Sequence, residues 1–303
     1  VAEPFLDTRH VGSVMETKNL KLELKSAKGK KVVTKYEEFK KECEREIAAY
    51  STNEQFLRAS QNWIELANVA KYSYHFEWLG RPMIQYPQDI VAIQELIWQS
   101  KPDLIIEIGI AHGGSLIMSA SMLAMLDYCE AVETGRTLDP QVASRRVLGL
   151  DIDIRSHNRE AIEAHPMSHR IDMIQGSSIA SEIIERVHEI ANGYNRILVL
   201  LDSNHTHEHV LAELEAYAPL TSKDSYCVVF DTIVEDLPDE MHQERPWSQG
   251  NNPKTAVWEY LRRLKEEGRS AKDGGSLTLE IDKSIENKLL ITVSPDGFLK
   301  RVD

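Results

Sequence analysis

The sequence predicts an α/β protein with a doubly wound, mostly parallel, Rossmann-like sheet, a last strand that runs antiparallel, and an N-terminal helical extension. Strand-length runs of apolar and β-branched residues alternate with segments of helical periodicity from residue 87 onward. The first such run, residues 103–108, passes through a glycine-rich turn into a helix. This unit places a ligand on a helix N-terminus in open α/β sheets.

The N-terminal part, residues 1–71, is predicted to be an arm followed by a helical extension, and residues 72–303 to form the α/β domain. Residues 1–34 are lysine-rich and lack a clear period, so we expect an arm or a short hairpin there. Aromatic and apolar residues recur at helical spacing over 36–50 and 56–67. We expect these helices to pack on the domain or on a second subunit, and therefore expect a homo-oligomer.

The domain is expected to begin with an irregular aromatic segment. Residues 72–87 are rich in aromatic side chains and include Pro82 and Pro87, which excludes a long regular helix. The segment either lines the mouth of a pocket or is a structured linker. A helix is then predicted from Pro87 to Ile97.

The remaining elements alternate as in a parallel sheet that is covered by helices on both faces. Further strands are predicted at 146–153, 171–178, 196–202 and 226–231, and helices at 116–126, 179–191, 208–217 and 251–267. Two final strands, near 277–283 and 288–294, are joined by a short turn at Glu286 and Asn287, so we expect them to pair antiparallel.

The composition excludes several classes of partner. The formal net charge of −13 argues against nonspecific binding to nucleic acid or to an anionic membrane. The three cysteines are scattered and odd in number, so we expect no disulfide framework and a reducing cytoplasm. No apolar run approaches membrane-spanning length and no signal peptide is visible.

The glycine spacing after the first strand narrows the choice of ligand. Gly109 is followed by Gly113 and Gly114, with Ala111 where a dinucleotide fingerprint would need its second glycine, and no Walker-type lysine follows. The pattern is either a tight turn without a ligand or resembles motif I of class I S-adenosylmethionine (SAM) methyltransferases. In that motif the glycines let the chain turn under the methionine moiety, and the helix N-terminus can receive its carboxylate.

Polar groups at the strand ends should line one crevice. Asp151, after the glycine turn, is placed to accept hydrogen bonds from ribose hydroxyls, although a single such Asp is often a helix cap. Ser178 also follows a strand end. The predicted cofactor-binding residues are Glu107, Gly109, Ala111, Gly113, Ser115, Asp151, Ser177 and Asp202.

The histidine-rich stretch 202–209 has three possible functions: a transition-metal site, a general base, or a polar helix start. A metal site would use His205 and His209, which share a face if both are helical. We favour a base, His205, with Asp202 as the second catalytic residue. Asp202 and Asp231 end adjacent predicted strands, so their carboxylates could share Mg²⁺ and help to activate a substrate hydroxyl.

Together these motifs resemble the cephalosporin hydroxylase family, whose members look like class I SAM-dependent O-methyltransferases. The stretches that carry the resemblance are 78–82, 85–87, 106–115, 149–153, 201–211 and 228–232. The resemblance implies SAM, an assisting Mg²⁺, and methyl transfer to a hydroxyl of a small molecule such as a sugar or natural-product intermediate. The family's metal site uses a Glu-Asp pair at the end of the fifth strand, and Phe230 stands here in place of the Glu.

Two other functions compete with methyl transfer. A nicotinamide- or iron-dependent oxidoreductase or hydroxylase lacks support, because neither G-x-G-x-x-G nor a His-x-Asp…His triad is present. A non-catalytic binding module is favoured only by Phe230. The irregular loop 235–252, which includes Trp247, is either a lid or substrate wall or an ordinary surface loop.

Overall fold

The computed structural model describes residues 34–303, so the arm predicted for residues 1–34 lies almost entirely outside the described part. The chain divides into two compact units between Glu46 and Ile47. Helix α1, Lys35–Tyr50, crosses this division and has no buried residue. The helix that we predict at 36–50 is therefore confirmed, whereas the boundary that we predict at residues 71/72 stays a prediction.

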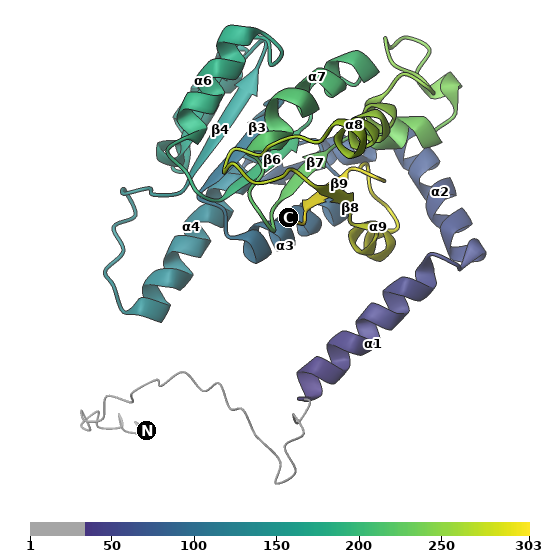
Figure 1. Ribbon diagram of the computed structural model, residues 1–303, viewed down its shortest axis with the longest axis horizontal. Helices are drawn as coiled ribbons and strands as arrows, with labels where there is room; N and C mark the ends of the chain where they lie inside the picture. Colours follow the sequence, from purple (N-terminus) through teal and green to yellow (C-terminus); the bar gives the residue numbers. More distant parts are fainter. Residues whose placement is uncertain (1–33) are drawn as a thin grey trace, which may run out of the picture. The chain divides into compact units, whose positions relative to one another are not determined.

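A seven-stranded sheet forms the centre of the larger unit, in the order β5-β4-β3-β6-β7-β9-β8 (Figure 1). The strands are β3 (Leu104–Ile108), β4 (Arg146–Asp151), β5 (Ile171–Gln175), β6 (Ile197–Leu201), β7 (Tyr226–Val229), β8 (Leu279–Ile281) and β9 (Phe298–Arg301). Strands β3 to β7 are parallel, and β9 is antiparallel to both of its neighbours. The predicted fold class is confirmed.

Helices cover both faces of this sheet (Figure 1). They are α3 (Pro87–Ser100), α4 (Gly114–Thr134), α5 (Ser156–Glu163), α6 (Ser181–Ala191), α7 (His207–Tyr217), α8 (Pro253–Glu267) and α9 (Lys283–Leu289). Helix α2 (Glu54–Val69) packs instead on residues that follow β7. Side chains of β3 alternate between two cores: Leu104 and Ile106 pack with residues of α6, α7 and α8, and Ile105 packs with residues of α3 and α4. Burial on both faces explains the uninterrupted apolar runs that made these strands predictable.

Helix α4 is long and apolar enough, by length and composition alone, to cross a membrane. Half of that span is buried inside the fold, and a core helix of a soluble protein meets the same criteria. Its buried residues include Leu116, Ile117 and Leu123, which pack against the sheet.

The prediction of a strand at 288–294 is wrong. After β8 the chain forms α9, which Asp282 caps by accepting a hydrogen bond from the Ser284 amide. The β-branched run beyond it does not join the sheet, because the buried carboxylate of Asp89 accepts the Thr292 hydroxyl and the Val293 amide. The last strand is β9 instead, and it pairs antiparallel with β8, while the turn that we predict at Glu286 and Asn287 lies inside α9.

The aromatic segment forms a short antiparallel hairpin, β1 (Phe76–Trp78) and β2 (Arg81–Met83), after a 3₁₀ turn at Tyr72–His75. Helix α2 packs within the same compact unit, since its Ile64 shares a small core with residues that follow β7.

Candidate active site

The site lies where the strand order reverses. Strand β3 has β4 on one side and β6 on the other, and open α/β sheets bind ligands at such a point, outside the carboxyl ends of the strands. A cavity of about 290 Å³ lies there, close to the lower end of the range for ligand pockets. Five predicted cofactor residues line it: Gly109, Ala111, Asp151, Ser177 and Asp202.

The glycine turn is shaped by a close approach of two backbones. Gly109 has φ +101°, and a Cβ at this position would lie 1.9 Å from the carbonyl oxygen of Asp202. Gly113 is the N-cap of α4 with φ +82°. The turn therefore holds the end of β3 directly against the end of β6 and leaves the N-terminus of α4 facing a second, smaller cavity that Gly113 and Ser115 also line.

Asp151 holds the turn in place from the neighbouring strand. Its Oδ2 accepts hydrogen bonds from the Ile110 amide at 2.8 Å and the Ala111 amide at 3.4 Å, and its Oδ1 accepts the Asp153 amide at 3.0 Å. Each carboxylate oxygen has two lone pairs, so the carboxylate keeps accepting capacity toward the cavity that it lines.

Glu107 does not line the cavity of about 290 Å³, which we call the main cavity. Its side chain is buried and accepts hydrogen bonds from the hydroxyls of Ser115 and Ser119. Burial raises the pKa of Glu107 to about 7, which the two hydroxyls partly counteract. Glu107 and Ser115 instead line a small internal cavity together with Asp202.

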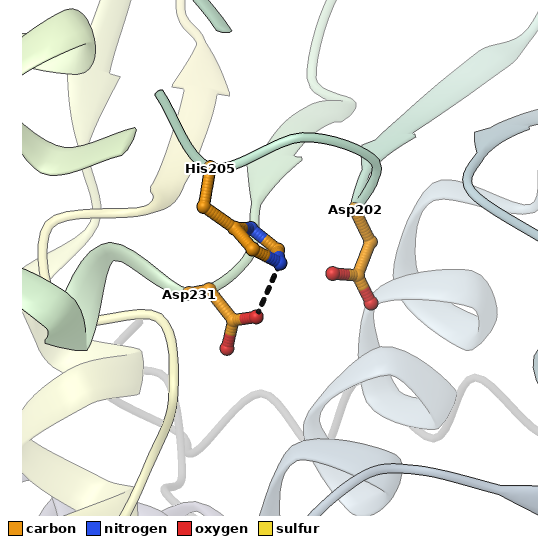
Figure 2. Close-up of side chains that lie close together, drawn as sticks. All are labelled: Asp202, His205 and Asp231. Carbon is orange, nitrogen blue, oxygen red and sulfur yellow. Dashed lines mark ion pairs between the residues drawn. The ribbon is translucent and has the colours of Figure 1, made fainter. Parts of the chain in front are cut away.

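Three side chains converge beside these cavities: Asp202 after β6, His205 in the loop before α7, and Asp231 after β7 (Figure 2). One ligand atom from each lies within 4.8 Å of the others. His205 Nε2 is 3.1 Å from Asp231 Oδ2. The ring of Trp247, which also lines the main cavity, packs edge-on against His205 with centroids 4.6 Å apart. The loop 235–252 thus contributes a wall, as one of our two interpretations predicts.

The electrostatics of this cluster are strongly negative. Burial raises the pKa of Asp202 well above its ordinary value, and the nearby carboxylates of Asp231, Glu107 and Glu213 raise it further. The Gln85 amide counteracts this by donating a hydrogen bond from Nε2 to Asp202 Oδ2 at 3.2 Å.

The donor set fits a divalent cation. Mg²⁺ is held in proteins by one or two carboxylates together with retained waters, which Asp202 and Asp231 can provide for. Phe230, buried beside them, offers no ligand atom, and the additional donor at this place is the imidazole of His205.

The other two histidines are separate from this cluster. Helix α7 begins at His207, so His205 is not helical and does not share a helix face with His209. His209 Nε2 lies 3.0 Å from Ser178 Oγ and 3.1 Å from a carboxylate oxygen of Glu213.

Two residues of the site escaped prediction. Glu213 is fully buried and accepts hydrogen bonds from Ser178 and Ser203, both at 2.5 Å. The sequence does indicate that Glu213 contacts His209, because residues four apart on a helix lie on the same face. Gln85 comes from the aromatic segment, and no spacing in the sequence indicates that it reaches Asp202.

Comparisons with known proteins identify the family. Residues 70–302 match the model of the Rhamnosyl O-methyltransferase/CmcI family. A rhamnosyl O-methyltransferase of Mycobacterium leprae is 28% identical over 164 residues, 53% of this chain and 62% of that protein. One of Mycobacterium bovis is 28% identical over 218 residues, 70% of this chain and 73% of that protein. A structure of CmcI with Mg and SAM is 17% identical, covers 76% of this chain and 78% of that one, and has a TM-score of 0.47.

Proposed function

We propose that this chain, which belongs to the Rhamnosyl O-methyltransferase/CmcI family, is a SAM-dependent O-methyltransferase that acts on a hydroxyl of a sugar or natural-product intermediate. The mycobacterial relatives named as rhamnosyl O-methyltransferases support the reaction and the substrate class. The observation that carries the proposal is the cavity at the strand-order reversal, with the glycine turn on one side and the Asp202 cluster beside it.

The chain offers a separate group to each part of SAM. The N-terminus of α4, after Gly113, can receive the methionine carboxylate through its free amides. Asp151 has one lone pair left, on Oδ1, for a ribose hydroxyl. Asp202 lines all three cavities at this sheet edge, which supports a place for it beside both reactants.

Methyl transfer then needs little covalent help from the protein. The acceptor oxygen forms a bond to the methyl carbon, the carbon–sulfur bond breaks, and its electron pair stays on sulfur as the sulfonium becomes a thioether. Holding the two reactants in line supplies roughly 7–11 kcal/mol of the barrier reduction.

The acceptor hydroxyl must also lose its proton. Without a cation, His205 is the base, because Asp231 holds its ring by Nε2 and a neutral imidazole that donates from one nitrogen can accept a proton at the other. A divalent cation bound by Asp202 and Asp231 would supply Lewis acidity and lower the pKa of the hydroxyl.

Titration calorimetry with SAM and transfer of labelled methyl groups to a rhamnosyl glycoside test the proposal. We expect SAM to bind and label to appear on the sugar.

The substitution Asp202→Ala should reduce transfer by at least about 100-fold while SAM affinity survives, because Asp202 serves the acceptor side of the reaction. Asp172→Ala, an exposed acid on β5, is the control and should leave both quantities unchanged. Failure of SAM to bind at millimolar concentration, or equal loss of affinity and activity in Asp202→Ala, would contradict the proposal.

A further inference from the structure

We propose that Asp202, His205 and Asp231 form a three-ligand site for a divalent transition-metal ion, with the imidazole Nε2 as the third protein ligand, and that this site prefers such an ion to Mg²⁺. The inference deepens the proposed function, because the ion would lie beside the acceptor hydroxyl. It changes the identity of the metal and the function of His205.

The geometry of the three side chains is that of ligands around one ion. All three point toward one another, and the ring of His205 turns its Nε2 into the gap beside the two carboxylates (Figure 2). Two ligands that are about 2.1 Å from an ion and at right angles to each other lie about 3.0 Å apart. The separation of 3.1 Å between His205 Nε2 and Asp231 Oδ2 matches this value.

The charge around the cluster favours a cation. The carboxylates of Asp231, Glu107 and Glu213 all act on Asp202. Among residues 34–303, no Lys or Arg forms an ion pair with any of these four acids. Their partners are serine hydroxyls on Glu107 and Glu213, histidines beside Glu213 and Asp231, and the Gln85 amide on Asp202. Unpaired charges of like sign are costly when they are removed from water, and a bound divalent ion would offset that cost.

Buried polar atoms beside the cluster also lack partners. Within the described part of the chain, the Oε1 atom of Gln85, whose Nε2 donates to Asp202, has no hydrogen-bond partner, and neither has the hydroxyl of Tyr86. Tyr86 is almost completely buried, and the carboxylates of Asp89 and Asp231 add to the burial that raises its pKa to about 12. Waters on a bound ion would give both atoms a partner, as the outer hydrogen bonds of metal sites commonly do.

The donor types decide which ion is preferred. Mg²⁺ favours a set of oxygen ligands, whereas imidazole nitrogen suits Mn²⁺, Fe²⁺, Co²⁺ and Zn²⁺ increasingly well. Phe230 leaves no third carboxylate at the end of β7. A nitrogen bound to an ion cannot take a proton at the same atom, so in this state His205 would be a ligand. The ion would lower the pKa of the acceptor hydroxyl, and the released proton would pass to solvent water.

Electron paramagnetic resonance of Mn²⁺ added to the SAM-free, full-length protein tests the ligand set. We expect one bound ion whose electron spin-echo envelope shows ¹⁴N coupling that disappears when the histidines are labelled with ¹⁵N. His205→Gln should remove the coupling and weaken Mn²⁺ binding by roughly tenfold or more. The matched control is His207→Gln, whose ring bonds Thr255 outside the cluster, and it should retain both.

Competition by Mg²⁺ tests the preference. Phe230→Glu adds a carboxylate at the end of β7, so the Mg²⁺ concentration that displaces Mn²⁺ should fall by roughly tenfold. Phe230→Leu removes the same ring without adding a ligand and should leave that concentration unchanged. Melting curves check that Phe230→Glu is folded, and the wild-type ¹⁴N signal decides the ligand set independently of that variant.

Mn²⁺ that fails to bind, binds without ¹⁴N coupling, or is displaced equally well by Mg²⁺ would overturn the inference. SAM binding is measured in the same preparations by calorimetry. A protein that binds SAM and transfers methyl groups but shows none of the metal results contradicts only this inference, and one that binds Mn²⁺ but not SAM contradicts only the proposed function.

Discussion

At the scale of single residues, the protonation of Glu107 makes the stability of the fold depend on pH. It is buried at the end of β3, and its pKa rises from the ordinary 4.5 to about 7. Between these values the folded protein keeps a proton that the unfolded chain releases, so the contribution of Glu107 to the free energy of unfolding falls as the pH rises. Over the whole window this loss amounts to roughly 3 kcal/mol.

Glu107→Gln should remove this dependence, because the amide resembles the protonated acid and the Ser115 and Ser119 hydroxyls can accept from it. Urea unfolding at pH 5, 6, 7 and 8 measures the effect. We expect the stability of the variant relative to wild type to increase with pH through this range, and a constant difference between the two proteins would contradict the raised pKa.

The residues at strand ends were predictable because the direction of a parallel strand determines which end faces the crevice. Asp151, Asp202 and Asp231 were identified in this way, and the structure places all three at the same edge of the sheet. Gln85 and Glu213 were not identified, since their partners come from segments whose approach depends on tertiary packing. Glu107 was expected in the crevice, and it lines the small cavity that it shares with Asp202 but not the larger one, because its side chain turns toward Ser115 of α4.

At the scale of elements, the glycine turn joins β3 to β6 sterically. Gly109→Ala should destabilise the protein by about 3 kcal/mol or more, because the positive φ is strained for alanine and the new Cβ would overlap the Asp202 carbonyl. Gly80, in the β1–β2 turn, also has a positive φ but no atom within 4 Å of a new Cβ. Gly80→Ala should therefore cost only about 1–2 kcal/mol. Equal losses in urea unfolding would show that the contact with Asp202 does not matter.

The helices and strands were predictable where a single hydrophobic pattern ran through the whole element. The parallel strands stand out because they are buried on both faces, and the long helices because their apolar residues repeat. The segment 288–294 misled us, since its β-branched run has the composition of a strand but its amide at Val293 and hydroxyl at Thr292 bond Asp89 of α3. A local pattern does not reveal a buried acceptor that lies two hundred residues away.

At the scale of the whole molecule, the extent of the folding unit is open to a direct test. The compact unit begins at Ile47, whereas the sequence predicts a domain that begins at residue 72. The two boundaries differ in whether helix α2 belongs to the domain. Its Ile64 packs with Ile233 and Leu237, and its Trp63 ring lies 5.6 Å from that of Tyr86.

Removal of residues 1–46 should leave the melting temperature within about 2 °C of that of the full chain. Removal of residues 1–71 should lower it by about 5–10 °C, because it takes away the burial of Ile64 and Trp63, which stabilises the fold by about 2–4 kcal/mol. Calorimetric melting of the two shortened chains, each with and without SAM, measures this. Both should still gain stability from SAM, since Pro82 is the first of the described residues that lines any of the three cavities at the site. Equal melting temperatures for the two would place the start of the domain at residue 72, as the sequence predicts, and would make α2 an appendage.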